Sequence, residues 1–151
     1  MRPTDVDYDG EISGSYEQGR GLSADAVGTW RHAIDGQIPD DGMIVDVGAG
    51  TGRFARELDL IAPGRVIAVE PSAGMRESAP RPTSEQIAWL GSGAEALPLR
   101  DGSVELVWSA FTTHYFDLDA AATEFARVLR PGGRVLIWHA FPDVFDDLEW
   151  F

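Results

Sequence analysis

The sequence contains no cysteine and no lysine, and these absences narrow the classes of protein that it can encode. Without cysteine there is no disulfide framework, no thiolate zinc site and no thiol nucleophile. All 12 basic residues are arginines, and 25 acidic residues bring the net charge to −13. Such a surface repels a phosphate backbone and anionic lipid, so we expect no nucleic-acid and no membrane partner. A small-molecule acceptor or a protein partner fits better, although the acidity could also serve solubility alone.

Long apolar runs are absent too. No stretch approaches the length of a membrane span, and the first ten residues lack the apolar core of a signal peptide, so we expect a cytoplasmic protein. A chain of 151 residues is long enough for one domain with a real core. No set of histidines and acids has metal-ligand spacing, and no serine lies in a nucleophile elbow, so no metal site is expected.

The most informative stretch is residues 43–56, M-I-V-D-V-G-A-G-T-G-R-F-A-R. Its apolar, β-branched start predicts a buried parallel strand, and its last residues begin a helical spacing. Between them stand three glycines on alternate positions, Gly48, Gly50 and Gly52. A strand, a glycine turn and a helix N-terminus form a cradle for a small molecule, because glycine lets a ligand approach the backbone closely.

The glycine spacing and Asp46 indicate which ligand this cradle would take. A dinucleotide fingerprint reads G-x-G-x-x-G and holds a pyrophosphate, whereas this loop reads G-x-G-x-G. A carboxylate at Asp46 would repel a pyrophosphate and attract a cation. S-adenosylmethionine carries an ammonium and a sulfonium and no phosphate, so both features favour it over a nicotinamide cofactor.

The run V-D-V-G-A-G-T-G resembles the first motif of the class I S-adenosylmethionine-dependent methyltransferases, in the small-molecule branch that resembles the ubiquinone and menaquinone methylases. The resemblance extends from about residue 44 to residue 138. It implies an α/β fold with a Rossmann-like, doubly wound, mostly parallel sheet. It also implies methyl transfer to a small-molecule acceptor by direct displacement, with S-adenosylhomocysteine as the product. The cofactor would then contact Asp46, Gly48, Ala49, Gly50 and Gly52.

A second buried strand is expected at residues 66–69, and Glu70 follows it directly. An acid at the tip of this strand is placed to accept hydrogen bonds from the ribose hydroxyls, although it could also be an exposed strand-end carboxylate. The next residues, Pro71, Ser72 and Met75, resemble the family's run beside the adenine. Met75 is polarizable enough to lie against the ring, and it could equally belong to the core.

The remaining strands are expected at residues 87–90, 104–110 and 134–138, with a helix from Asp117 and a turn at 129–133, L-R-P-G-G. After the third strand, Gly93, Ala94 and Glu95 resemble the family's adenine-edge motif. The Ala94 amide would meet a ring nitrogen, and Glu95 would accept from the adenine amino group. Ser109 would reach the ligand-binding rim at the end of the fourth strand.

Residues 1–40 are interpreted as an N-terminal arm and a leading helix, and residues 41–151 as the cofactor-binding core. The helix is expected from Leu22 to Ile34, with Ser23 as its N-cap. The resemblance implies that Tyr16 and Arg20 close over the cofactor as a lid, with Arg20 meeting its carboxylate. A solvated terminal tail is the competing interpretation.

For catalysis, His114 is the candidate general base and Tyr115 the candidate acceptor-positioning residue. Both follow the fourth strand in T-T-H-Y-F. A base is needed only if the acceptor must lose a proton, and a lone histidine is more often structural. His139 and His32 are weaker candidates.

The chain departs from the family after the fifth strand, where only residues 140–151 remain, too few for the usual two further strands. The expected sheet is therefore truncated, with an apolar edge that natural proteins avoid leaving open. A fragment of a longer enzyme, a homodimer through this edge, or a tail folded over it would each explain the departure. The alternative function is a non-catalytic S-adenosylmethionine-binding subunit that needs a partner or the missing strands.

Overall fold

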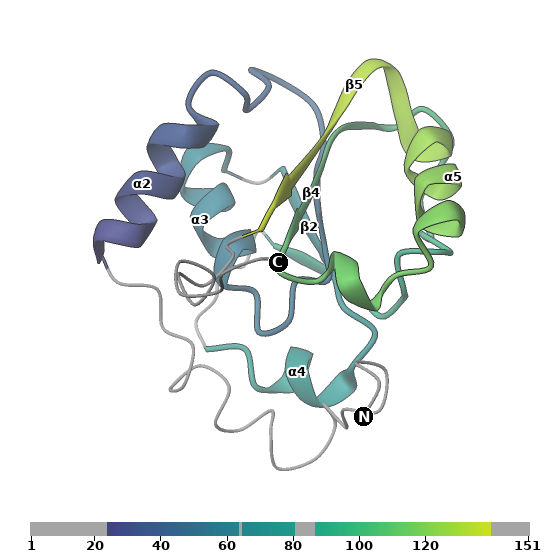
Figure 1. The fold of residues 1–151 in the computed structure, drawn as a ribbon, viewed down its shortest axis with the longest axis horizontal. Coiled ribbons are helices and arrows are strands. Elements are labelled where there is room, and N and C mark those ends of the chain that lie inside the picture. Colours follow the sequence, from purple (N-terminus) through teal and green to yellow (C-terminus); the bar gives the residue numbers. More distant parts are fainter. Residues whose placement is uncertain (1–23, 64, 81–86, 140–151) are drawn as a thin grey trace, which may run out of the picture.

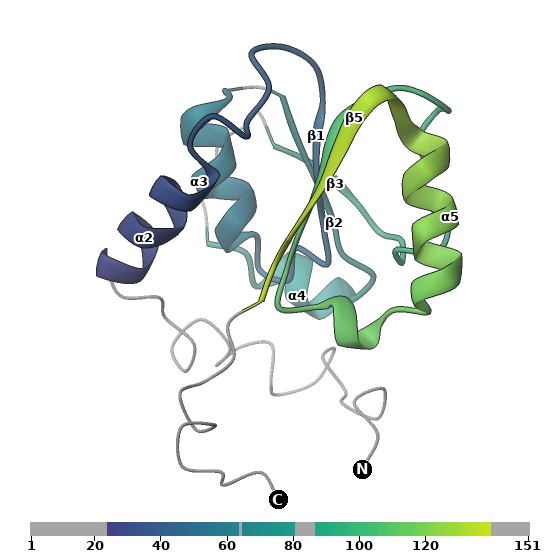
Figure 2. The ribbon, with the colours of Figure 1, turned by 45° about the horizontal axis from the view of Figure 1, so that its top comes forward.

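A computed structural model describes residues 24–63, 65–80 and 87–139, and within them five strands form one all-parallel sheet (Figures 1 and 2). The order across the sheet is β3-β2-β1-β4-β5. The strands are β1 (Ile44–Val47), β2 (Val66–Val69), β3 (Ala88–Leu90), β4 (Val104–Ala110) and β5 (Leu129–Trp138). Because the chain starts in the middle and winds outward in both directions, the fold is the doubly wound α/β class that the sequence predicts.

Helices cover both faces of this sheet. They are α2 (Ala24–Ile34), α3 (Arg53–Ile61), α4 (Ala73–Glu77) and α5 (Leu118–Val128), with a short 3₁₀ turn η2 (Thr113–Tyr115). Figure 2 shows α2 and α3 together on one side of the sheet and α5 on the other. Sheets of parallel strands are covered in this way because their crossover helices lie on the faces.

The two faces have separate cores. On the side of α2 and α3, Trp30, Phe54 and Trp108 are buried and their rings lie 5.4–5.7 Å apart. On the side of α5, the helix buries Ala121, Phe125 and Val128 against β1 and β4 valines. The leading helix therefore packs on the sheet as the sequence predicts. It shares a core with the strands, and the division at residue 40 stays a prediction.

The central strand β1 is buried along its whole length, and its neighbours fix its register. Ile44 pairs with Val66 and with Leu106, and Asp46 pairs with Ala68 and with Trp108. This parallel register brings the carboxyl ends of β1, β2 and β4 to one edge of the sheet. That edge, which we call the rim, is where open α/β sheets bind ligands.

The strand boundaries agree with the predicted ones to within one residue except at β5. The stretch L-R-P-G-G was predicted as a turn before a strand at residue 134, but the strand begins at Leu129. Between the Val104–Leu129 and Leu106–Arg134 pairs, β4 advances by two residues and β5 by five. The extra residues form an irregularity in the ladder at Gly132, whose φ of 84° is readily adopted only by glycine.

The segment between β3 and β4 contains no regular element, and α5 holds it in place. The Arg127 guanidinium donates to the carbonyls of Leu97 and Leu99, at 2.9 and 2.8 Å. The Glu124 carboxylate accepts from the Leu97 amide at 2.6 Å and pairs with Arg127, whose hydrogen bond lowers the pKa of Glu124. These bonds satisfy backbone groups that a loop would otherwise leave to water.

Beyond β5, the described part of the sheet has no further strand. Val135 and Ile137 on this strand are 39% and 55% exposed, so the apolar edge expected from the sequence is present. Among the described residues, no helix is both long enough and apolar enough to traverse a bilayer.

Candidate functional site

The loop between β1 and α3 lies at the rim, and each of its three glycines has a positive φ: 76° at Gly48, 58° at Gly50 and 80° at Gly52. The amides of Gly48 and Ala49 both donate to the Val69 carbonyl, at 2.9 and 3.0 Å, which ties the loop to β2. A residue with a side chain is strained at these angles. The sequence pattern therefore reflects a backbone requirement as well as room for a ligand.

Two of the glycines also have no space for a side chain. A Cβ on Gly48 would lie 2.5 Å from the Thr112 hydroxyl oxygen, and a Cβ on Gly52 would lie 2.7 Å from the Trp89 ring. Gly52 is the N-cap of α3 and supplies no side-chain bond to the helix amides. The loop thus lies tightly against the residues after β4 and against β3.

Glu70, at the tip of β2, joins the glycine loop to the next turn. One of its carboxylate oxygens accepts from the Gly50 amide and the other from the Ser72 amide, each at 2.9 Å. The side chain is 9% exposed, so it is not the open strand-end carboxylate of the competing interpretation. A carboxylate has about four acceptor sites, so these two bonds do not exhaust its capacity.

Asp46 lies beneath the loop and is 1% exposed. Burial, and next the negative charge of Glu70, raise its pKa from 3.8 to about 8, while a hydrogen bond from the Ala55 amide opposes the rise. Its Oδ2 has no hydrogen-bond partner among the described residues. Asp46 is therefore largely protonated at pH 7, whereas the Coulomb argument from the sequence uses its ionised form. A cation placed beside it would lower that pKa again.

The residues predicted around the adenine lie on two neighbouring turns. Ser72 caps α4 by accepting from the Met75 amide at 3.1 Å, and Pro71 before it is exposed. Met75 is 3% exposed, and its Cε lies 3.3 Å from where a Cβ on Gly50 would stand. Met75 thus supports the glycine loop from the core, and a contact with adenine remains a prediction.

The second adenine turn follows β3. Ala94 is 2% exposed, and the Glu95 carboxylate accepts from the Asp117 amide at 2.9 Å, next to the start of α5. A Cβ on Gly93 would lie 2.7 Å from the other carboxylate oxygen of Glu95. The side chain predicted to meet the adenine amino group is thus fixed to α5 in this structure.

At the end of β4, the structure brings forward a residue that the sequence analysis missed. Ser109 is fully buried, and its hydroxyl lies 2.9 Å from the Thr112 hydroxyl. Thr112 also contacts the Val47 carbonyl at 3.4 Å and packs on Gly48. Thr112 therefore packs directly on the glycine loop, and the role of Ser109 stays a prediction. In the sequence, Gly48 indicates that some neighbour packs closely on the loop, because glycine has no side chain. No sequence pattern identifies that neighbour as Thr112.

The candidate catalytic residues lie beyond Thr112. His114 is exposed, Tyr115 is half-buried, and their ring centroids are 4.0 Å apart in η2. Of the weaker histidines, His139 directly follows β5 and its ring lies 6.2 Å from that of His114. Tyr16, Arg20 and Ser23 lie outside the described residues. Within those residues, no group of three histidines or acids is arranged to hold a metal ion.

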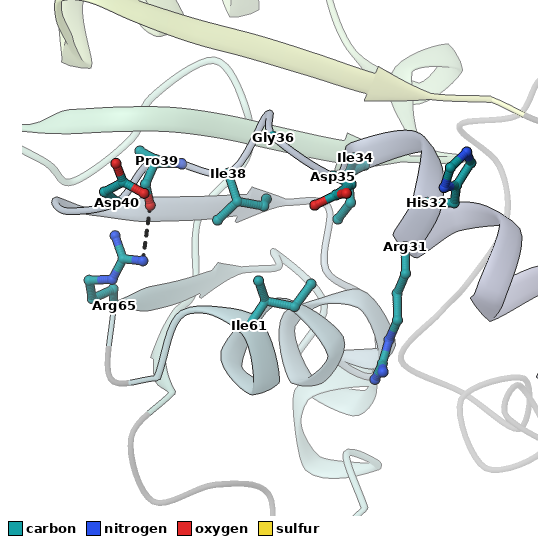
Figure 3. A pocket seen from close by; sticks show the side chains of 10 residues that line it. All are labelled: Arg31, His32, Ile34, Asp35, Gly36, Ile38, Pro39, Asp40, Ile61 and Arg65. Carbon is teal, nitrogen blue, oxygen red and sulfur yellow. Dashed lines mark hydrogen bonds between the residues drawn. The ribbon is translucent and has the colours of Figure 1, made fainter.

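A hollow of about 670 Å³ lies elsewhere, beside the end of α2 and the segment leading into β1 (Figure 3). Ile34, Ile38 and Ile61 line it, and Arg65 donates to the Pro39 and Gly42 carbonyls at its edge. These residues precede β1 and β2, so the hollow is at the amino ends of the strands and opposite the rim. Its arginine is engaged in holding the chain entering β1.

The sequence is similar to known methyltransferases. A methyltransferase-domain family model matches residues 45–137. An uncharacterized methyltransferase of Mycobacterium tuberculosis is 38% identical over 133 residues, which are 86% of this chain and 51% of that protein. The malonyl-[acyl-carrier protein] O-methyltransferase of Methylococcus capsulatus is 36% identical over 134 residues, covering 86% of this chain and 46% of that protein.

Solved structures agree with the sequence relatives. A crystal structure of an S-adenosylmethionine-dependent methyltransferase from Thermotoga maritima matches with a TM-score of 0.69 and 30% identity. The match covers 86% of this chain and 58% of that one. The chain belongs to the class I S-adenosylmethionine-dependent methyltransferases. It spans about half the length of the curated relatives that it matches.

The residues of the rim fit the cofactor that this methyltransferase family uses. The glycine loop permits close approach of a ligand, and Asp46 offers one buried carboxyl oxygen without a partner in the described part of the chain. Glu70 is a second acid, at the tip of the neighbouring strand β2, and accepts from the Gly50 amide. The charge of Glu70 suits a cationic nucleoside, and so does Asp46 once a cation beside it lowers its pKa.

The crowding at Gly48 predicts a large loss of stability for Gly48→Ala. Its matched control is Gly102→Ala, since Gly102 also has a positive φ, 61°, but open space around it. Strain alone costs about 1–2 kcal/mol in either variant. We expect Gly48→Ala to cost at least about 1 kcal/mol more because Thr112 must move. Urea denaturation measures the difference, and equal losses would show that the loop is not packed against Thr112.

The raised pKa of Asp46 predicts that the stability of Asp46→Asn relative to the wild type increases as the pH rises. The native state keeps a proton that the unfolded chain loses near pH 3.8, so the wild type loses stability between about pH 4 and pH 8. Asparagine has no such dependence. We expect the melting temperature of the variant relative to the wild type to rise from pH 5 to pH 8 and then level off. A difference that is the same at pH 5 and pH 8 would contradict the burial of an ionisable Asp46.

Proposed function

We propose that the chain binds S-adenosylmethionine at the rim and supports methyl transfer to a small-molecule acceptor. The observation that carries the proposal is that Glu70 accepts hydrogen bonds from the Gly50 and Ser72 amides and interacts electrostatically with a second buried acid, Asp46. The malonyl-[acyl-carrier protein] O-methyltransferase relative supports an acceptor that is not a nucleic acid. The net charge of −13 supports the same choice.

In this proposal the glycine loop, with Gly48, Ala49, Gly50 and Gly52, approaches the cofactor through its backbone. Asp46 faces the cationic end, and Glu70 accepts hydrogen bonds from the ribose. Contacts of the cofactor with four further parts of the chain remain predictions. These parts are the turn after β2, the turn after β3, the end of β4 and the N-terminal arm, and their residues follow in that order. They are Pro71, Ser72, Met75, Gly93, Ala94, Glu95, Ser109, Tyr16 and Arg20.

S-adenosylmethionine, when bound, would supply an electrophilic methyl group on a sulfonium sulfur that serves as the leaving group. The chain would contribute by aligning the acceptor with that methyl group. His114, exposed at the end of β4, would take the proton that an O–H or N–H acceptor loses. Tyr115, whose ring is tilted against that of His114, would position the acceptor.

A second candidate function is cofactor binding without turnover. The exposed Val135 and Ile137 favour it, because an open sheet edge suits a partner, a second copy of the chain or further strands of a longer protein. A homodimer through β5 would leave the rim of each copy unchanged. A cytoplasmic location is part of the proposal in either case.

We predict that Glu70→Ala weakens the affinity for S-adenosylmethionine at least about 10-fold, because charge-assisted hydrogen bonds contribute about 1.5–3 kcal/mol each. Isothermal titration calorimetry measures it, with circular dichroism to confirm folding. The matched control is Glu57→Gln, which removes an acid on α3 that pairs with Arg31 at the surface. Unchanged affinity in Glu70→Ala would refute the proposed pocket, and tighter binding of NAD by the wild type would favour an oxidoreductase.

A second prediction separates enzyme from binding subunit. In a reaction with methyl-labelled cofactor and an extract of small metabolites, the wild type should transfer label. His114→Asn should lower the rate about 100-fold for an acceptor that must lose a proton, while the affinity for S-adenosylhomocysteine stays the same. Binding without any transfer of label by the wild type would favour the non-catalytic function.

A further inference from the structure

A continuous series of rings runs from the core to the surface of the rim. Consecutive centroids are 5.7, 5.9, 6.4, 6.2 and 4.0 Å apart, so each ring lies close to the next. In order, the rings are Trp108, Phe54, Phe111, His139, His114 and Tyr115. The inner two are buried, while the outer four are half-buried or exposed.

Phe111, where the series leaves the core, has an unusual backbone. Its φ of 59° is positive, and among the described residues no other non-glycine residue shares this property. Such a conformation is strained for a bulky side chain and persists only where the surroundings enforce it. Here the Phe111 amide donates to the Trp138 carbonyl at 3.0 Å, and its ring packs on Phe54. A glycine would relieve the strain but would remove the ring. The chain therefore keeps an aromatic ring at this position despite the unfavourable backbone conformation.

The outer rings stand beside the proposed cofactor loop. They belong to the segments that directly follow β4 and β5, whose carboxyl ends are at the rim. Thr112, adjacent to Phe111 in sequence, packs on Gly48 and contacts the Val47 carbonyl. A group that receives a methyl from a cofactor held by this loop must approach from an adjoining surface, and the rings of residues 111–115 and His139 form one.

We propose that Phe111, His114, Tyr115 and His139 form the acceptor-binding wall of this methyltransferase, and that the acceptor carries an aromatic ring. Rings of this kind bind flat π systems by offset stacking or edge-to-face contact, which a saturated ring of the same size does not reproduce. The net charge of −13 favours a neutral or cationic acceptor over a carboxylate. Phe111 and His139 thereby become positioning residues. The proposal rests on the proposed function, which places the methyl donor at the adjoining loop.

The test compares matched probes by NMR titration of the full chain, with and without saturating S-adenosylhomocysteine. Phenol and benzylamine carry the ring, cyclohexanol and cyclohexylmethylamine are their saturated counterparts of the same charge, and benzoate tests the charge. We expect the aromatic members to bind about fivefold more tightly than their counterparts. Benzoate should be the weakest of the aromatic probes.

Variants then locate the preference. Phe111→Gly removes the ring while suiting the positive φ, and His139→Leu removes an imidazole but keeps bulk. Both should abolish the preference for aromatic probes while leaving the affinity for S-adenosylhomocysteine unchanged. The matched control is Phe116→Leu, because Phe116 belongs to the same segment but its ring meets Phe125 on α5. That variant should keep the preference.

Equal binding of aromatic and saturated probes by the wild type would contradict the proposal of an aromatic acceptor-binding wall. A loss in Phe116→Leu as large as that in Phe111→Gly would also overturn it. Absence of S-adenosylhomocysteine binding would instead refute the proposed function. The preference for aromatic probes, measured on the cofactor-free chain, would still test the aromatic wall. A failure of the proposed function can therefore be distinguished from a failure of the wall.

Discussion

The rim depends on one buried carboxylate. Glu70 accepts from Gly50 in the loop after β1 and from Ser72 in the turn after β2, so a single side chain fixes two turns that are 22 residues apart. Its charge is also next to Asp46, where it adds to the effect of burial on the pKa. Both acids thus belong to one electrostatic unit, held in place by the parallel register of β1 with β2. Everything proposed about cofactor binding follows from this arrangement.

The same register explains why residues far apart in sequence meet at the rim. In a doubly wound sheet the central strand is flanked by β2 on one side and β4 on the other. The loop after β1 therefore touches both Val69 and Thr112. The helices α3 and α5 cover opposite faces and leave the carboxyl ends open between them. The fold separates the two acids, on β1 and at the tip of β2, from the outer aromatic rings, which follow β4 and β5.

Much of this fold could be predicted because the strands are short apolar runs bounded by glycine, proline and acid. Residues 66–69 and 104–110 were predicted at the bounds that β2 and β4 have. The prediction was wrong at residues 129–133, because proline and glycines indicate a turn locally, while pairing with β4 extends the strand through them. Tertiary pairing overrode the local preference.

The candidate site was less predictable because burial and contacts across the fold decide it. The sequence places Asp46 beside the glycines but does not indicate that the carboxyl is enclosed and largely protonated. It indicates Ser109 at the end of β4, while the neighbour of Gly48 is Thr112. The strained backbone of Phe111 has no sequence signature at all, because positive φ is expected only of glycine, asparagine or aspartate.

The enclosure of Asp46 has a thermodynamic consequence for any cation that comes to rest beside it. Near neutral pH such a cation takes the place of a proton, and that proton passes to the buffer. The heat of association then includes the ionisation heat of the buffer, so it differs between phosphate and Tris at the same pH. The apparent association constant also rises with alkalinity until the carboxyl is ionised in the free protein. In this chain, binding of a cation at the rim is therefore linked to the release of a hydrogen ion to the solvent.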